Sequence, residues 1–240
     1  AKRVLRRARP VMLHLVLGLA LYNSDLLFLR ALRSSPDVGI YAATYTLISF
    51  AGNLGVAYGM SLMPSLASLP RGGPEQRALY HTAVLHSAAI AVPTFVGGVF
   101  VAPDVMRLVF GGQYAEGGPL LQILLASIPI FTARLIVFFA LVVHAGEQSL
   151  VRAIVEALFA NILLNLVLIQ ALGTIGAAWA TVATEVVFCA LLARYGRSEG
   201  LRFPPIKRFW QPLVACAVMG LALVVAGEQN ALLRVAIGAT

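Results

Sequence analysis

The residues of this sequence that could do chemistry are polar side chains that interrupt long apolar runs. The first such run contains Asp25 and then Arg30, and the next run contains Tyr45. A reversal of the chain near Ser35 would bring Asp25 close to Tyr45. A carboxylate at membrane depth is costly and usually faces protein or water. Asp25 could bind a sugar hydroxyl, hold a coupling cation or form a structural pair with an arginine, and the sequence leaves these three roles open.

A second polar group lies in later apolar runs. Its members are Arg134, Glu156, Asn161, Asn165 and Glu185. Antiparallel folding of the run with Arg134 onto the next run sets this arginine level with residue 160. A turn at Gly173 sets Glu185 level with residue 162. We therefore expect the five side chains to meet near the middle of the membrane, on three adjacent helices.

Members of the second group have both a structural and a functional interpretation. Asn161 and Asn165 are one helical turn apart and share a face, where interhelical hydrogen bonds of roughly 0.6 to 2 kcal/mol would stabilise packing. The same amides could line a site. Arg134 could form an ion pair with Glu156 or Glu185. Alternatively it could face a cavity, because a guanidinium binds a diphosphate through paired hydrogen bonds.

The elements that must position these residues are apolar runs long enough to cross a bilayer. About 20 helical residues cover the roughly 30 Å hydrocarbon core. The predicted spans are Val11–Leu32, Val38–Leu66, Leu79–Ala102, Pro119–Val143, Val151–Leu172, Ile175–Tyr195 and Trp210–Ala226. An eighth span begins at Ala231 and stops at Thr240. The expected fold class is an all-α, polytopic membrane protein.

Lysine and arginine fall on alternate sides of these spans. The connectors before the odd-numbered spans hold thirteen of these residues, and the intervening connectors hold three. Lys and Arg are retained on the cytoplasmic side of a membrane. We therefore expect the amino end and the segments 69–78, 145–150 and 194–209 to be cytoplasmic.

Composition excludes several other classes of protein. Hydrophobic residues make up 60% of the chain and charged residues 12%, with a mean hydropathy of +0.86, whereas about a quarter of a soluble domain is charged. The net charge is +8, but the basic residues lie at span ends, so no nucleic-acid partner is expected. His81 and His86 lack the spacing of a helical zinc site. Neither a phosphate loop with its lysine nor a GxSxG elbow occurs, so neither an enzyme nor a bound cofactor is expected.

Small residues and prolines inside the spans predict how the helices pack. Small residues at helical spacing let backbones approach closely in lipid. Two such stripes are Ala51, Gly55 and Gly59, and Gly176, Ala180 and Thr184. Pro93 and Pro129 fall within spans and each removes a backbone donor, so both helices should kink.

Three stretches of the sequence are similar to segments of a known transporter family. They are VGIYAATYTL from Val38, RLVFGGQYAEGGPLLQIL from Arg107, and NILLNLVLIQALGTIGAAWATVATE from Asn161. The third includes Asn165 and Glu185. In this order the stretches resemble the polysaccharide, or O-antigen type, flippases of the multidrug/oligosaccharidyl-lipid/polysaccharide (MOP) exporter superfamily.

The resemblance implies the carboxy-terminal lobe of a two-lobe transporter, with the transport cavity between the lobes. Residues 1–9 would be a basic cytoplasmic segment and 10–195 the six-helix lobe. Residues 196–209 would be a cytoplasmic linker, and 210–240 an appended helix pair whose second helix is incomplete. The amino-terminal lobe of the same protein would then be a partner that this sequence lacks.

The resemblance also implies a function. The lobe would help to flip a lipid-linked oligosaccharide or polysaccharide repeat unit, on an undecaprenyl diphosphate carrier, across the bacterial inner membrane by alternating access. A proton or sodium gradient would supply the energy, and membrane lipids and polysaccharide polymerase machinery would be partners. One alternative is a cation-coupled multidrug antiporter of the same superfamily, which would need Asp25, Glu156 and Glu185 unpaired in the cavity. A second is a non-transporting membrane fragment.

Overall fold

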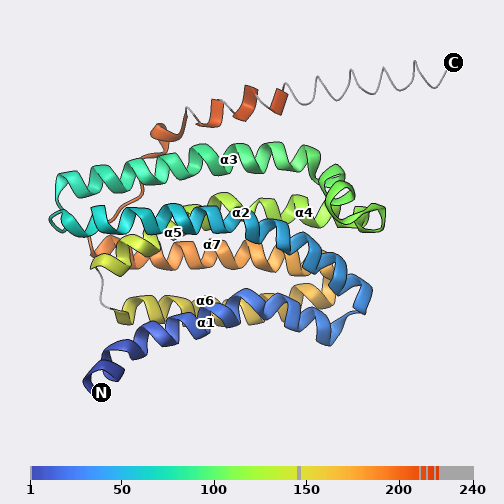
Figure 1. The fold of residues 1–240 in the computed structure, drawn as a ribbon, viewed down its shortest axis with the longest axis horizontal. Coiled ribbons are helices and arrows are strands. Elements are labelled where there is room, and N and C mark those ends of the chain that lie inside the picture. The colour runs from blue at the N-terminus through green and yellow to red at the C-terminus, as the bar shows by residue number, and fades with distance from the viewer. Residues whose placement is uncertain (1, 145–146, 211, 215, 219, 222–240) are drawn as a thin grey trace.

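The computed structural model describes residues 2–144, 147–210, 212–214, 216–218 and 220–221, which form helices joined by turns and short loops (Figure 1). The elements are α1 (Lys2–Leu32), α2 (Ser35–Ser68), α3 (Pro74–Phe110), η1 (Gly112–Gly117), α4 (Gly118–Leu125), α5 (Ser127–His144), α6 (Glu147–Leu172), α7 (Thr174–Ser198) and η2 (Ile206–Phe209). The expected all-α class is confirmed.

Each predicted span of the lobe except the fourth lies within one of these helices. In the part of the chain that the structure describes, five stretches are long and apolar enough to cross a membrane: α2, α3, the run from η1 through α5, α6 and α7. The first predicted span, Val11–Leu32, lies within α1. Helix α1 begins at Lys2, so the basic segment predicted at residues 1–9 is helical from that residue. A multi-pass membrane protein is therefore shown.

The fourth predicted span, Pro119–Val143, is two helices rather than one. Helix α4 ends and α5 begins on either side of Ala126. Pro129 has no backbone N–H to donate to the carbonyl of Leu125, so the expected kink takes the form of this break. Pro93, in contrast, lies inside α3, which stays one helix.

Close approaches of glycines fix the packing around the centre of the lobe. Helix α5 contacts α2, α3 and α7, while α1 packs on α6 (Figure 1). A Cβ at Gly59 on α2 would overlap the Phe139 ring on α5, and one at Gly55 would lie 3.0 Å from the Thr132 methyl. A Cβ at Gly176 would overlap a carbonyl of α6. The predicted small-residue stripes thus lie at helix contacts.

Buried apolar side chains form two clusters, one toward each end of the helices. One includes Tyr80 and Leu192. The other includes Met106 and Leu124. Arg134 and Asn161 are buried at the level between these clusters, which is where the sequence placed its second polar group.

The described part of the segment after the lobe lies beside α3 (Figure 1). The described residues between Trp210 and Leu221 are helical, and a Cβ at Gly220 would lie 3.5 Å from Val96 on α3. The rest of the seventh predicted span, the eighth from Ala231 and its end at Thr240 lie outside the described residues. The four-part division of the chain therefore stays a prediction.

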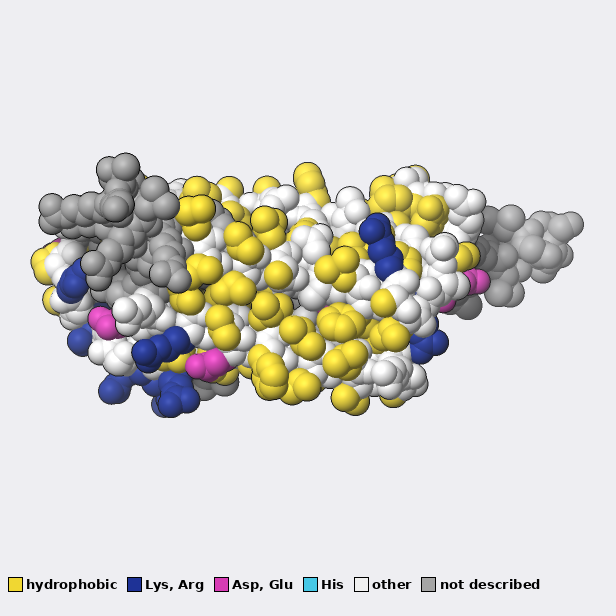
Figure 2. All heavy atoms as spheres, turned by 90° about the horizontal axis from the view of Figure 1, so that it is seen from below, with side chains coloured by type: hydrophobic (Ala, Val, Ile, Leu, Met, Phe, Trp, Pro, Cys, Tyr) yellow, Lys and Arg dark blue, Asp and Glu magenta, His cyan; other side chains and the backbone are white. Residues whose placement is uncertain are grey.

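Charged side chains gather at one end of the lobe, and apolar side chains cover its middle (Figure 2). That end holds the α2–α3 turn, the start of α6 and the end of α7. These are the segments expected to be cytoplasmic. The charge distribution is what that orientation requires, and the orientation itself stays a prediction.

Candidate functional site

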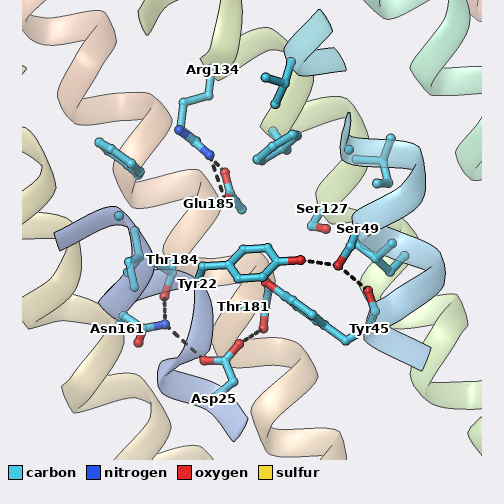
Figure 3. Close-up of a pocket in the computed structure, with 18 of the residues that line it drawn as sticks. Tyr22, Asp25, Tyr45, Ser49, Ser127, Arg134, Asn161, Thr181, Thr184 and Glu185 are labelled. Carbon is cyan, nitrogen blue, oxygen red and sulfur yellow. Dashed lines mark hydrogen bonds and ion pairs between the residues drawn. The ribbon is translucent and has the colours of Figure 1, made fainter. Parts of the chain in front are cut away.

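Five helices, α1, α2, α5, α6 and α7, enclose a cavity of about 340 Å³ (Figure 3). Tyr22 on α1 and Asn53 on α2 line this cavity and are also exposed, Tyr22 by 46%. The cavity therefore opens between α1 and α2. A hydrogen bond between the hydroxyls of Tyr22 and Ser49 crosses this mouth.

Asp25 lies at the base of the cavity and is only 3% exposed. Its Oδ1 accepts hydrogen bonds from the side-chain amides of Asn165, at 2.6 Å, and Asn161, at 3.3 Å. Its Oδ2 accepts from the hydroxyls of Thr181, at 2.5 Å, and Tyr41, at 3.2 Å. We name these five residues the Asp25 cluster. In the described residues no lysine, arginine or histidine forms a salt bridge with Asp25.

The Asp25 cluster has spare acceptor capacity. Asn165 is fully buried, and its Oδ1 has no hydrogen-bond partner among the described residues. The Thr181 hydroxyl also reaches the carbonyl of Ala177, at 3.1 Å. Buried polar groups are normally satisfied, so an orphan amide oxygen next to a carboxylate marks a place that can accept a proton donor or a cation.

Arg134 and Glu185 form an ion pair on the cavity wall above the cluster (Figure 3). The guanidinium donates from Nε at 2.6 Å and from Nη2 at 3.2 Å to the two carboxylate oxygens. It also lies 4.4 Å from the Phe188 ring centroid and 4.9 Å from that of Phe131. Two aromatic faces and a fork-to-fork ion pair therefore hold this side chain in one position.

The structure brings together most of the residues that the sequence singled out. Asp25, Tyr45, Arg134, Asn161 and Glu185 line the cavity, and Asn165 lies behind them in the cluster. Of the two partners considered for Arg134, the structure has Glu185. The tyrosine bonded to Asp25 is Tyr41, one turn before the expected Tyr45, whose ring stacks on that of Tyr41 at 5.9 Å.

Two of the predicted residues do not reach the site. Arg30 is exposed on α1 and does not line the cavity. Glu156 is exposed on α6 and accepts a hydrogen bond from the Tyr195 hydroxyl, at 3.0 Å. Each is five residues from a cluster member, Asp25 or Asn161, and five residues turn a helix by about 140° beyond a full turn. Their side chains therefore point away from the cavity.

Sequence reasoning missed several functional candidates. Tyr41 and Thr181 bond to Asp25 directly, and Thr184 accepts from Asn161 at 3.1 Å. A signal existed, because Tyr41 precedes Tyr45 by one helical turn and Thr181 precedes Glu185 by one turn. These residues were noted only in the similar stretches or in a packing stripe.

Two curated proteins of Haloferax volcanii are similar to this chain. The probable low-salt glycan biosynthesis flippase Agl15 is 23% identical over 201 residues, and the probable flippase AglR is 25% identical over 207 residues. Each alignment covers 83% of this chain, but 42% of Agl15 and 43% of AglR. The chain thus spans less than half the length of these relatives. No protein-family model matches the chain.

Solved structures with a similar fold are transporters. The lipid II flippase MurJ in its inward closed conformation has a TM-score of 0.80 at 13% identity, covering 94% of this chain and 48% of MurJ. An outward-facing multidrug resistance MATE family transporter of the MOP superfamily has a TM-score of 0.67 at 17% identity, covering 92% of this chain and 53% of that protein. The fold is that of about half of such a transporter. The predicted resemblance to flippases is confirmed by Agl15 and AglR, and the fold is shared with a transporter of the MOP superfamily.

Proposed function

We propose that this chain is one lobe of a transporter that flips a lipid-linked glycan across the cytoplasmic membrane by alternating access. The observation that carries the proposal is the similarity, over 83% of the chain, to Agl15 and AglR, both named as flippases and one as a flippase of glycan biosynthesis. The fold shared with MurJ supports the lobe architecture. The protein would be a transporter rather than an enzyme. Its partners would be a second lobe, an undecaprenyl-diphosphate-linked glycan, membrane lipids and polymerase machinery.

The Asp25 cluster is a suitable place for the coupling ion. It combines one buried carboxylate with neutral oxygens of Asn165, Thr181 and Ala177. In the described residues no three His, Cys, Asp or Glu side chains gather as a polyvalent metal would need. A single negative charge among neutral oxygens suits sodium or a proton, and hard cations prefer oxygen ligands. Ionisable side chains buried at membrane depth commonly mark ion or proton pathways in transporters.

The coupling proposal can be tested through thermal stability and transport in the full-length protein that contains this chain. A ligand that binds only the folded state raises the melting temperature. If the ion is sodium, sodium chloride should raise the melting temperature relative to choline chloride. If the ion is a proton, transport should depend on pH. Asp25→Asn should remove whichever dependence is found. Asp104→Asn, which changes an exposed carboxylate on α3, is the control. The assignment would be contradicted if the protein showed no dependence on sodium or on pH. It would also be contradicted if the dependence survived in Asp25→Asn.

A cation-coupled drug antiporter is the second candidate function. Of the three carboxylates that this function would need unpaired in the cavity, Glu185 is paired with Arg134 and Glu156 lies outside the cavity. Asp25 alone has no cationic partner among the described residues, and it could attract an organic cation. The MATE transporter with a similar fold is named for multidrug resistance. Export of an organic cation that depends on Asp25 would favour this candidate.

The decisive experiment is complementation of a strain that cannot export its lipid-linked polysaccharide. The full-length gene should restore surface polysaccharide, and Asp25→Ala should abolish it in protein that is present at normal levels in the membrane. Arg134→Ala should also lower it, while Arg107→Ala, an exposed arginine on α3, should not. Correctly inserted protein that restores nothing, but exports an organic cation, would contradict the flippase proposal.

A further inference from the structure

The charge of the cavity lining bears on which part of a lipid-linked glycan this lobe binds. A diphosphate needs cations with free hydrogen-bonding capacity. Among the described residues that line the cavity, Arg134 is the only Lys or Arg, and two carboxylates, Asp25 and Glu185, accompany it. The lining therefore carries one more carboxylate than cations. A diphosphate would meet net repulsion here.

The charge of Arg134 is also already compensated by Glu185. Both oxygens of Glu185 accept hydrogen bonds from it, and two aromatic rings flank the guanidinium. Releasing it toward a phosphate would leave Glu185 as an unpaired carboxylate, 15% exposed, and a buried site strongly disfavours an uncompensated charge. As a neutral pair, the two groups instead offer nearby donors and acceptors. Vicinal hydroxyls of a sugar need such a combination.

The mouth of the cavity adds aromatic faces and neutral polar groups. The Tyr22 and Tyr45 rings meet edge to face, with centroids 5.2 Å apart. Asn53 lines the mouth and makes no hydrogen bond in the part of the chain that the structure describes, and Ser49 lies next to it. Aromatic faces carry partial negative charge and pack against C–H groups. Amides and hydroxyls both donate and accept hydrogen bonds.

From this combination we infer that the cavity of this lobe binds an uncharged sugar ring of the substrate, with Tyr22 as the stacking surface, and that the diphosphate is bound elsewhere. The inference rests on the proposed flippase function. The cavity volume of about 340 Å³ lies at the lower end of the roughly 300–1,000 Å³ range of ligand sites. That space fits a small polar unit and not a polyprenyl chain.

The test compares two probes on the full-length protein in detergent micelles. One is the lipid-linked glycan that accumulates in the complementation strain, and the other is undecaprenyl diphosphate without sugar. We expect the wild type to bind the glycan probe at least tenfold more tightly. Tyr22→Ala should reduce that ratio to within twofold without changing the affinity for undecaprenyl diphosphate. Tyr22→Phe, which keeps the ring, should keep most of the ratio.

Control variants separate this inference from the proposed function. Phe159→Ala removes an exposed ring on α6 outside the cavity and should change neither affinity. The sugar site would be overturned if Tyr22→Ala lost affinity for both probes equally, or if folded Tyr22→Ala kept the wild-type ratio of the two affinities. Either result would leave the flippase proposal intact. Failure of the wild type to complement the strain would instead reject the flippase proposal. Tighter binding of tetraphenylphosphonium than of the glycan probe would overturn both.

Discussion

The ion pair between Arg134 and Glu185 gives a prediction whose size follows from the structure. The two side chains are 9% and 15% exposed, so water screens the pair only weakly. Removing one partner of a buried pair costs about 3–5 kcal/mol, because the other charge stays buried without compensation. Arg134→Met should therefore lower the free energy of unfolding by about that amount. Glu185→Met should cost less by about 1–2 kcal/mol, since the guanidinium keeps its cation–π contacts with Phe131 and Phe188.

The double variant is the informative one. Replacing both partners of a buried pair by apolar side chains is often neutral or stabilising. The free energy of unfolding of the double variant Arg134→Met with Glu185→Met should therefore lie within about 2 kcal/mol of the wild-type value. That loss is well below the sum of the losses in the two single variants. This coupling identifies the pair as one structural unit.

The assay is SDS-induced unfolding of the full-length protein in mixed micelles, followed by far-ultraviolet circular dichroism. Complementation by the double variant reports on function separately from stability. If the pair only stabilises the fold and its removal leaves stability unchanged, the double variant should still complement the strain. Single variants within about 1 kcal/mol of the wild type would refute the reasoning. So would a double variant that loses the full sum.

Three further predictions concern packing, capping and topology. Gly176→Ala should abolish folding, because its Cβ would overlap the Leu168 carbonyl. A Cβ at Gly39 has no atom within 4 Å, so Gly39→Ala should leave the yield of folded protein in size-exclusion chromatography unchanged. Arg33→Ala should lower the unfolding free energy by about 1.5–3 kcal/mol through loss of the charged hydrogen bond to the Ile169 carbonyl, at 2.6 Å, and Arg30→Ala should not. In intact cells a membrane-impermeant thiol reagent should label Gln113→Cys and not Glu75→Cys; the reverse pattern would invert the predicted orientation.

Length and apolar composition were sufficient to locate the spans of the lobe, because a span needs only these two properties. The spans around Asp25 and Asn161 fall inside α1 and α6. The break at Ala126 was not predictable as a break. A proline removes one donor, and whether the helix bends or ends there depends on neighbouring contacts, as the contrast between Pro129 and Pro93 shows.

The candidate site was harder to predict because the depth of a side chain in the membrane and the direction in which it points are separate quantities. Folding a hairpin about its turn gives the depth of a side chain in the membrane, and on that criterion Glu156 and Glu185 were equal partners for Arg134. Which way a side chain points depends on helix phase, advancing about 100° per residue. Phase relative to Asn161 places Glu156 on the opposite side of α6, where the structure has it exposed.

Phase also explains why the Asp25 cluster is more extensive than the sequence indicated. Once Asp25 and Asn161 face each other, a hydroxyl one turn from a cavity residue on an adjacent helix can reach the same place, as Thr181 does through its spacing from Glu185. A lone hydroxyl in an apolar helix can equally bond its own backbone, as Thr46 does to Ala42 at 2.9 Å. Sequence alone does not separate these cases. The partner across the helix interface decides, and that partner is a property of the packing of α1 against α6 and α7.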